Sequence, residues 1–147
     1  MKETPYMVFA GTKSRYLAEE ICKELGCELG QMNTTYFADG EFAVSFEESI
    51  RGKDVFIFQD VENHQPLVLN GGKNTQVLSV NDHIMSMLVT IDAVRQAGAA
   101  EITLVLPVYP YSRQHKKKGR EGLTASLLGH IYENMGVKRI ITLDIHS

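Results

Sequence analysis

The stretch VFIFQD, residues 55–60, places four apolar residues in a row before a polar pair. An unbroken apolar run of this length is typical of a strand buried on both faces, as in a parallel sheet. Further strands are expected for YMVFAG at 6–11, ITLVLP at 102–107 and RIITLDIHS at 139–147. Helical patterns lie between these runs, at 12–26, 81–99 and 123–136.

This alternation of strands and helices predicts an α/β fold, in which a parallel sheet carries helices on both faces. In the first helical pattern, Leu17, Ile21 and Leu25 share one face, and Gly26 marks the end. In the second, the expected N-cap is Asn81 or Asp82.

A β-hairpin is expected outside this alternation. The runs MNTTYF at 32–37 and EFAVSF at 41–46 flank Asp39-Gly40, a dipeptide that favours tight hairpin turns. Residues 61–80 show no clean periodicity and are expected to form a long connection, which in compact domains is usually functional or mobile.

Composition narrows the possible classes of protein. The 147 residues suffice for one domain with a single core, and the net charge of −3 argues against a nucleic-acid binder. Neither a membrane-spanning run nor a signal peptide is recognisable, so we expect a cytoplasmic protein that does not bind membranes. Cys22 and Cys27 are expected to be reduced structural thiols.

A dense group of cations follows the strand expected at 102–106, and consists of Arg113, Lys116, Lys117, Lys118 and Arg120. Ligands of open α/β sheets bind beyond the carboxyl ends of the strands. Arginine presents a planar fork to phosphate oxygens, lysine adds a mobile charge, and a helix starting near Leu123 would add its amides. These residues predict a polyphosphate-binding loop; a solvated surface loop is the alternative.

Two further groups could carry chemistry. Asp144 and His146 lie two apart in the last expected strand, so both would project to one side at the same sheet edge. They suit a divalent ion or acid–base work, and a structural histidine is the alternative. At the hairpin turn, Phe37 could stack on a base while Asp39 and Glu41 accept hydrogen bonds; an ordinary hairpin tip is the alternative.

Four segments in this order resemble the ribose-phosphate pyrophosphokinase family, which makes phosphoribosyl pyrophosphate (PRPP). They are FADGE at 37–41, SIRGKDVFIFQ at 49–59, PVYPYSRQHKK at 107–117 and RIITLDIHS at 139–147. The resemblance implies a phosphoribosyltransferase-like fold. It also implies transfer of the β,γ-diphosphoryl group of ATP to the C1 hydroxyl of ribose 5-phosphate, with Mg²⁺.

The resemblance also implies roles for individual residues. Arg113 and Gln114 would contact ATP, and Phe37, Asp39 and Glu41 would form the adenine and ribose pocket from a neighbouring subunit of a homo-oligomer, a dimer or hexamer. His146 and Asp144 would line the magnesium site. Ser49 and Arg51 would fall in a regulatory phosphate region.

The resemblance covers only the first half of the family's usual chain. We therefore expect residues 1–147 to form the N-terminal ATP-binding domain, with the ribose 5-phosphate domain and the catalytic residues absent and the fragment itself inactive. His115 stands where the family usually has aspartate, and the 61–80 connection is longer than usual. The His115 substitution keeps open a non-catalytic regulatory subunit associated with the synthetase. A related domain with an unrelated ligand is a third reading.

Overall fold

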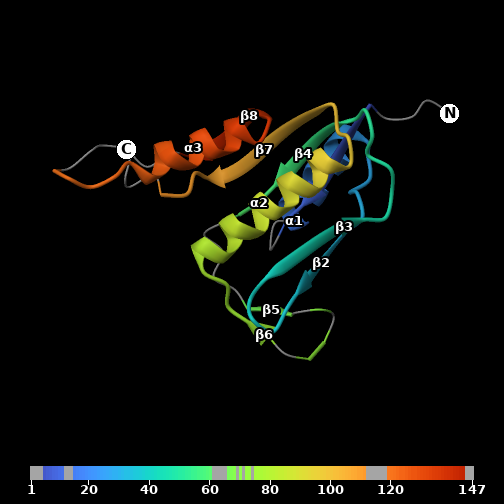
Figure 1. The fold of residues 1–147 in the computed structure, drawn as a ribbon. Coiled ribbons are helices and arrows are strands. Elements are labelled where there is room, and N and C mark those ends of the chain that lie inside the picture. Colours follow the sequence, from blue (N-terminus) through green and yellow to red (C-terminus); the bar gives the residue numbers. More distant parts are fainter. Residues whose placement is uncertain are drawn as a thin grey trace.

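The structure, a computed structural model, describes residues 5–11, 15–60, 66–68, 70, 72–73, 75–111 and 119–144, without the side chains of Leu67, Leu143 and Asp144. Four strands form the central sheet in the order β1-β4-β7-β8. Their bounds are Tyr6–Ala10, Asp54–Phe58, Glu101–Val108 and Val137–Asp144. Every neighbouring pair is parallel, which confirms the predicted parallel sheet (Figure 1).

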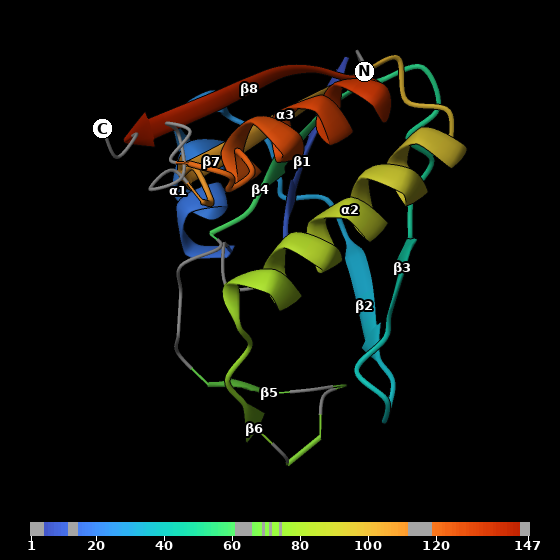
Figure 2. The same cartoon turned by 60° about the vertical axis from the view of Figure 1, so that its left-hand side comes forward.

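Helices cover both faces of this sheet, also as predicted. The helix α2 (Val80–Gln96) and the helix α3 (Thr124–Asn134) lie on one face, and α1 (Arg15–Leu25) lies on the other (Figure 2). Successive strand residues point to opposite faces. Accordingly, Phe9 joins the core under α2 and α3, whereas its neighbour Val8 joins the cluster under α1.

The face that α1 buries differs from the expected one. Ala18 and Cys22 are the buried residues of the helix, whereas Leu25 is 54% exposed. Leu17 and Ile21 are only partly buried, although they pack against the same cluster as Ala18 and Cys22. The apolar stripe thus predicted the helix, but it did not predict which side of the helix faces the sheet.

The start of α2 is also corrected by the structure. Its N-cap is Ser79, rather than Asn81 or Asp82. The Ser79 hydroxyl accepts a hydrogen bond from the Asp82 amide at 3.1 Å, and the Asp82 carboxylate accepts one from the Ser79 amide at 2.9 Å. This reciprocal capping box satisfies two backbone donors, which explains why the helix begins before the predicted residue.

Two hairpins lie below the sheet in Figure 1. The strands β2 (Met32–Tyr36) and β3 (Phe42–Phe46) pair antiparallel, which confirms the predicted hairpin. Within the 61–80 connection, β5 (Leu67–Val68) pairs with β6 (Thr75–Gln76), an element that the absence of periodicity did not reveal. In the part of the chain that the structure describes, no helix is long and apolar enough to span a bilayer.

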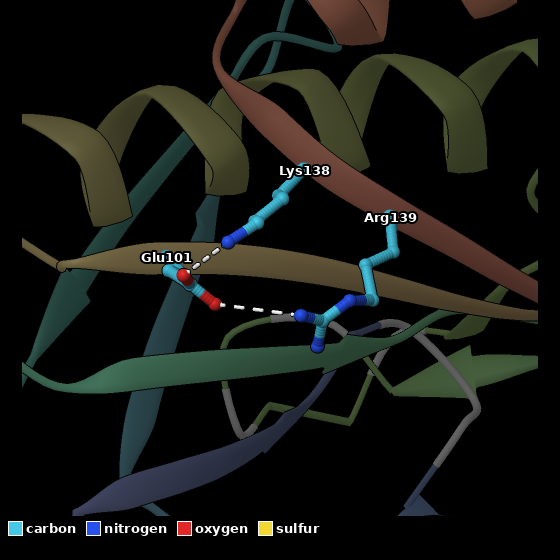
Figure 3. A network of polar contacts seen from close by, with 3 residues as sticks. All are labelled: Glu101, Lys138 and Arg139. Carbon is cyan, nitrogen blue, oxygen red and sulfur yellow. Dashed lines mark hydrogen bonds and ion pairs between the residues drawn. The ribbon is translucent and has the colours of Figure 1, made fainter.

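An ion-pair group ties together the first residues of β7 and β8. Figure 3 shows the Glu101 carboxylate between the Lys138 ammonium, to which it is hydrogen-bonded, and the Arg139 guanidinium 3.7 Å away. The hydrogen bond from Lys138, with the positive charges of both partners, lowers the pKa of Glu101 below its ordinary value of 4.5. Exposed pairs of this kind contribute little individually, but this group joins two neighbouring strands.

Glu101→Gln should therefore lower the melting temperature slightly at neutral pH. The pKa of Glu101 is lower in the folded chain than in the unfolded chain. The stabilisation that its carboxylate provides is therefore fully present above pH 4.5, and it is lost as the pH falls through the pKa of the folded chain. Melting curves of wild type and variant, followed by circular dichroism, should converge in acid. The exposed Glu121 provides the control as Glu121→Gln. A difference between wild type and E101Q that persists in acid would contradict the assignment.

Candidate functional site at the carboxyl edge of the sheet

The carboxyl ends of all four central strands meet at one edge of the sheet. Register pairs Ala10 with Phe58, Phe58 with Val105, and Val108 with Asp144. The end of β7, after which the cation-rich segment follows in the sequence, and the end of β8 therefore lie side by side, as the strand directions predicted. Arg113, Gln114, His115 and His146 lie outside the described residues, and so does the side chain of Asp144.

Two tyrosines hold the backbone where this segment leaves β7. The Tyr109 hydroxyl donates to the Ala125 carbonyl at 2.9 Å, in the first turn of α3. The Tyr111 hydroxyl donates to the side-chain oxygen of Asn81, in the first turn of α2. Tyr111 also has a φ of 60°, an uncommon conformation for a non-glycine residue that surrounding contacts must maintain. The amino ends of two helices are thereby placed beside the strand ends.

Sequence reasoning missed these tyrosines, although Tyr-Pro-Tyr directly after an apolar strand could have drawn attention to them. Burial raises the pKa of Tyr109 above its ordinary value of 10, so the hydroxyl, which is protonated at neutral pH in any case, remains a donor further into the alkaline range. Their contacts fix the base of the cation-rich segment on both sides.

A buried polar pair lies at the same edge, between β4 and α2. Gln59 and His83 are each 1% exposed, and the Gln59 side-chain nitrogen lies 3.5 Å from His83 Nδ1. Gly11 at the end of β1 leaves the space for this glutamine, because a Cβ there would lie 1.7 Å from the Gln59 side-chain oxygen. Nothing in the local sequence pattern pointed to this pair, since it depends on the meeting of three elements.

The residues of the hairpin turn lie elsewhere. Phe37 is 49% exposed, its amide donates to the Glu41 carbonyl at 2.9 Å, and the Asp39 side chain accepts from the Glu41 amide at 3.0 Å. The turn is therefore ordered from within. In Figure 2 the hairpin tip points away from the end of β8, so the chain does not bring Phe37, Asp39 and Glu41 to its own carboxyl edge.

Ser49 and Arg51 lie at the opposite, amino edge of the sheet. They precede β4 in a turn whose Gly52 amide donates to the Gly98 carbonyl at 2.8 Å. Ser49 and Arg51 are exposed, and Arg51 borders Gly98. The structure thus places these two residues at the edge of the sheet opposite the end of β7.

A large hollow of about 420 Å³ lies between α1 and the sheet, but its walls are apolar. Leu17, Phe56, Val105 and Ile141 contribute to it. Such walls do not suit a polyphosphate, because anionic oxygens removed from water require donors or cations.

Among the residues that the structure describes, no group of three or more His, Cys, Asp or Glu side chains could hold a metal ion.

Comparison with known proteins places this geometry in a family. Residues 6–136 match the sequence model for the N-terminal domain of ribose phosphate pyrophosphokinase. The ribose-phosphate pyrophosphokinase of Porphyromonas gingivalis is 44% identical over 146 residues, which are 99% of this chain and 42% of that protein. Ribose-phosphate pyrophosphokinase 1 of Listeria monocytogenes is 41% identical over 141 residues, 95% of this chain and 40% of the relative.

A solved structure agrees. The phosphoribosylpyrophosphate synthetase of Mycobacterium smegmatis superposes with a TM-score of 0.82 and 34% identity, covering 98% of this chain and 44% of that one. The chain thus spans about 40% of the length of the curated relatives that it matches. Together, these matches show that the chain belongs to the ribose-phosphate pyrophosphokinase family, of which it represents the N-terminal domain.

Proposed function

We propose that this chain binds magnesium-ATP for a ribose-phosphate diphosphokinase, which makes PRPP from ATP and ribose 5-phosphate. The observation that carries the proposal is the register of β7 and β8, which sets Val108 beside Asp144. The strand that leads into the cation-rich segment therefore ends next to Asp144, the acidic residue of β8, which supports a shared site for both. A triphosphate with its metal ion requires cations and an oxygen ligand within one small volume.

In this proposal the protein positions the reactants and provides charge. Transfer of a diphosphoryl group leaves little covalent chemistry to the protein, which must hold the reactants in line and neutralise spreading negative charge. Arg113 and Gln114 bind the nucleotide, and the amides at the start of α3 face the same edge. Tyr109 and Tyr111 keep the base of the segment in place through their bonds to α3 and α2.

Magnesium is the proposed metal ion, with Asp144 and His146 lining its site. The position of Asp144 at the carboxyl edge suits an oxygen ligand, since Mg²⁺ in phosphate sites is usually held by one or two carboxylates and the phosphates. A divalent ion there would neutralise charge on the phosphate oxygens.

A second copy of the chain completes the proposed site. The hairpin tip that carries Phe37, Asp39 and Glu41 points away from the end of β8 in its own chain (Figure 2), which supports the proposal that these residues serve the nucleotide of a neighbouring subunit. Ribose 5-phosphate would bind to a further domain, and this chain by itself would form no PRPP. Ser49 and Arg51, at the other edge, remain proposed contacts for a regulatory phosphate.

Titration of the ¹⁵N-labelled chain with ATP and Mg²⁺ tests the proposal. We expect amide shifts at Val108, Tyr109 and Tyr111 and at 123–125, with unchanged signals at Glu101 and Lys138 on the amino edge. Adenosine, which lacks phosphates, is the control ligand and should leave the amides of Val108, Tyr109 and Tyr111 unshifted. Unmoved carboxyl-edge amides at saturating ATP would remove the proposed function, and PRPP formation by the chain alone would overturn its proposed inactivity.

A further inference from the structure

A single asparagine connects the 61–80 connection to the hairpin that carries Phe37. Asn70 lies in the turn between β5 and β6. Its side-chain oxygen accepts a hydrogen bond from the Tyr36 amide at 2.9 Å, and its side-chain nitrogen donates to the Tyr36 carbonyl at 2.9 Å. The amide group thus pairs with both backbone groups of Tyr36, as a residue of a neighbouring strand would.

The pairing occupies the outer edge of β2. In an antiparallel ladder, consecutive residues direct their backbone groups to opposite edges. Phe37 directs its amide inward, to the carbonyl of Glu41 just before β3, and Tyr36 therefore directs its own amide and carbonyl outward. Without Asn70 these two groups would form an open strand edge, which proteins commonly cover.

The conformation of Asn70 suits this contact. Its φ is 53°, a left-handed conformation in which asparagine is several-fold enriched among non-glycine residues. The ring of Tyr36 is held as well, packed edge-on against Phe42 with 5.1 Å between ring centres. Burial raises the pKa of Tyr36 to about 12, consistent with a side chain partly enclosed at this point.

We propose that Asn70 is a positioning residue, which fixes the last residue of β2 and thereby the orientation of the loop bearing Phe37, Asp39 and Glu41. The inference rests on the proposed function, because it assigns that loop to the nucleotide. It gives the 61–80 connection a role: the β5–β6 hairpin supports the nucleotide loop from the outer edge (Figure 1).

Asn70→Gly tests this directly, because glycine keeps the left-handed backbone and removes only the side-chain amide. Two neutral hydrogen bonds are lost, so protection of the Tyr36 amide against hydrogen exchange should fall about tenfold or more, which corresponds to about 1.4 kcal/mol. The dissociation constant of magnesium-ATP, read from the Phe37 and Gly40 amide shifts, should rise about threefold to tenfold.

Two further variants make the test specific. Asn70→Asp keeps the acceptor for the Tyr36 amide but sets a carboxylate against the Tyr36 carbonyl, so it should weaken nucleotide binding while that amide stays protected. Asn33→Ala is the matched control, since Asn33 is in the same strand and donates to Glu47 at the end of the hairpin far from the turn. N33A should lower the melting temperature about as much as N70G does, but it should leave the dissociation constant of magnesium-ATP unchanged.

The outcomes separate this inference from the function on which it rests. A Tyr36 amide that exchanges freely in the wild type, or an N70G chain that binds magnesium-ATP as tightly as wild type, overturns the role of Asn70 alone. Equal weakening by N70G and N33A would show general destabilisation and would also overturn it. A wild-type chain whose amides do not respond to ATP removes the proposed function and this inference together.

Discussion

Gly30→Ala should lower the free energy of unfolding by about 1–3 kcal/mol, the usual cost of forcing an extra methyl group into a packed core. A Cβ built on Gly30 would lie 2.4 Å from Cε1 of Phe9 and 2.8 Å from its Cδ1. Carbon atoms do not approach so closely, so either the ring or the backbone must shift.

Neither group can yield easily. Phe9 is fully buried, and its ring packs against Phe46 with 4.9 Å between ring centres. On the other side, the Gly30 amide donates to the Val8 carbonyl at 2.8 Å, which fixes the backbone against β1. Urea unfolding followed by far-ultraviolet circular dichroism measures the loss.

Gly122→Ala is the matched control for Gly30→Ala. A Cβ on Gly122 would have no neighbour within 4 Å, so this substitution should change stability by less than about 0.5 kcal/mol. Combining Gly30→Ala with Phe9→Leu should cost less than the sum of the single changes, because the smaller side chain relieves the clash. If the losses of unfolding free energy for Gly30→Ala and Phe9→Leu were additive, the Phe9 ring would not restrict residue 30. A urea midpoint of G30A equal to that of wild type would lead to the same conclusion.

Arg113→Ala should weaken binding of magnesium-ATP by about 1.5–3 kcal/mol, the range for a hydrogen bond to a charged group, or roughly 10- to 150-fold. The reason is the proposed pairing of a guanidinium fork with phosphate oxygens, which a neutral methyl group cannot replace. Isothermal titration calorimetry at fixed ionic strength measures the change, since screening by salt would otherwise obscure it.

Arg139→Ala removes the same side chain from the amino edge, where Arg139 lies 3.7 Å from Glu101. It should leave nucleotide affinity unchanged although the net charge alters equally. If R113A and R139A weakened binding by the same amount, the effect would be one of overall charge, and Arg113 would not be a nucleotide contact.

Local patterns predicted the elements that depend on neighbours in the chain. Four consecutive apolar residues at 55–58 were enough to indicate a strand buried on both faces, and β4 has Ile57 fully buried. Asp39-Gly40 between alternating runs was enough to indicate the hairpin. The N-cap was misplaced because Asn81 and Ser79 are both good capping residues, and only the capping box with Asp82 decides between them.

The candidate site was predictable only where strand direction determines position. Parallel strands bring their carboxyl ends to one edge, which suffices to bring Val108 and Asp144 together. The support from Tyr109 and Tyr111 was not predictable, because each hydroxyl could have met several partners on either helix.

The sequence by itself determined the α/β alternation, the parallel sheet and the hairpin, since periodicity and turn chemistry act over a few residues. Only the tertiary structure decided that Asn70 pairs with Tyr36, 34 residues away, and that Tyr111 reaches Asn81, 30 residues away. Such contacts depend on how the packed elements bring distant segments together, and the free energy of that packing is distributed over the whole core rather than encoded in either segment.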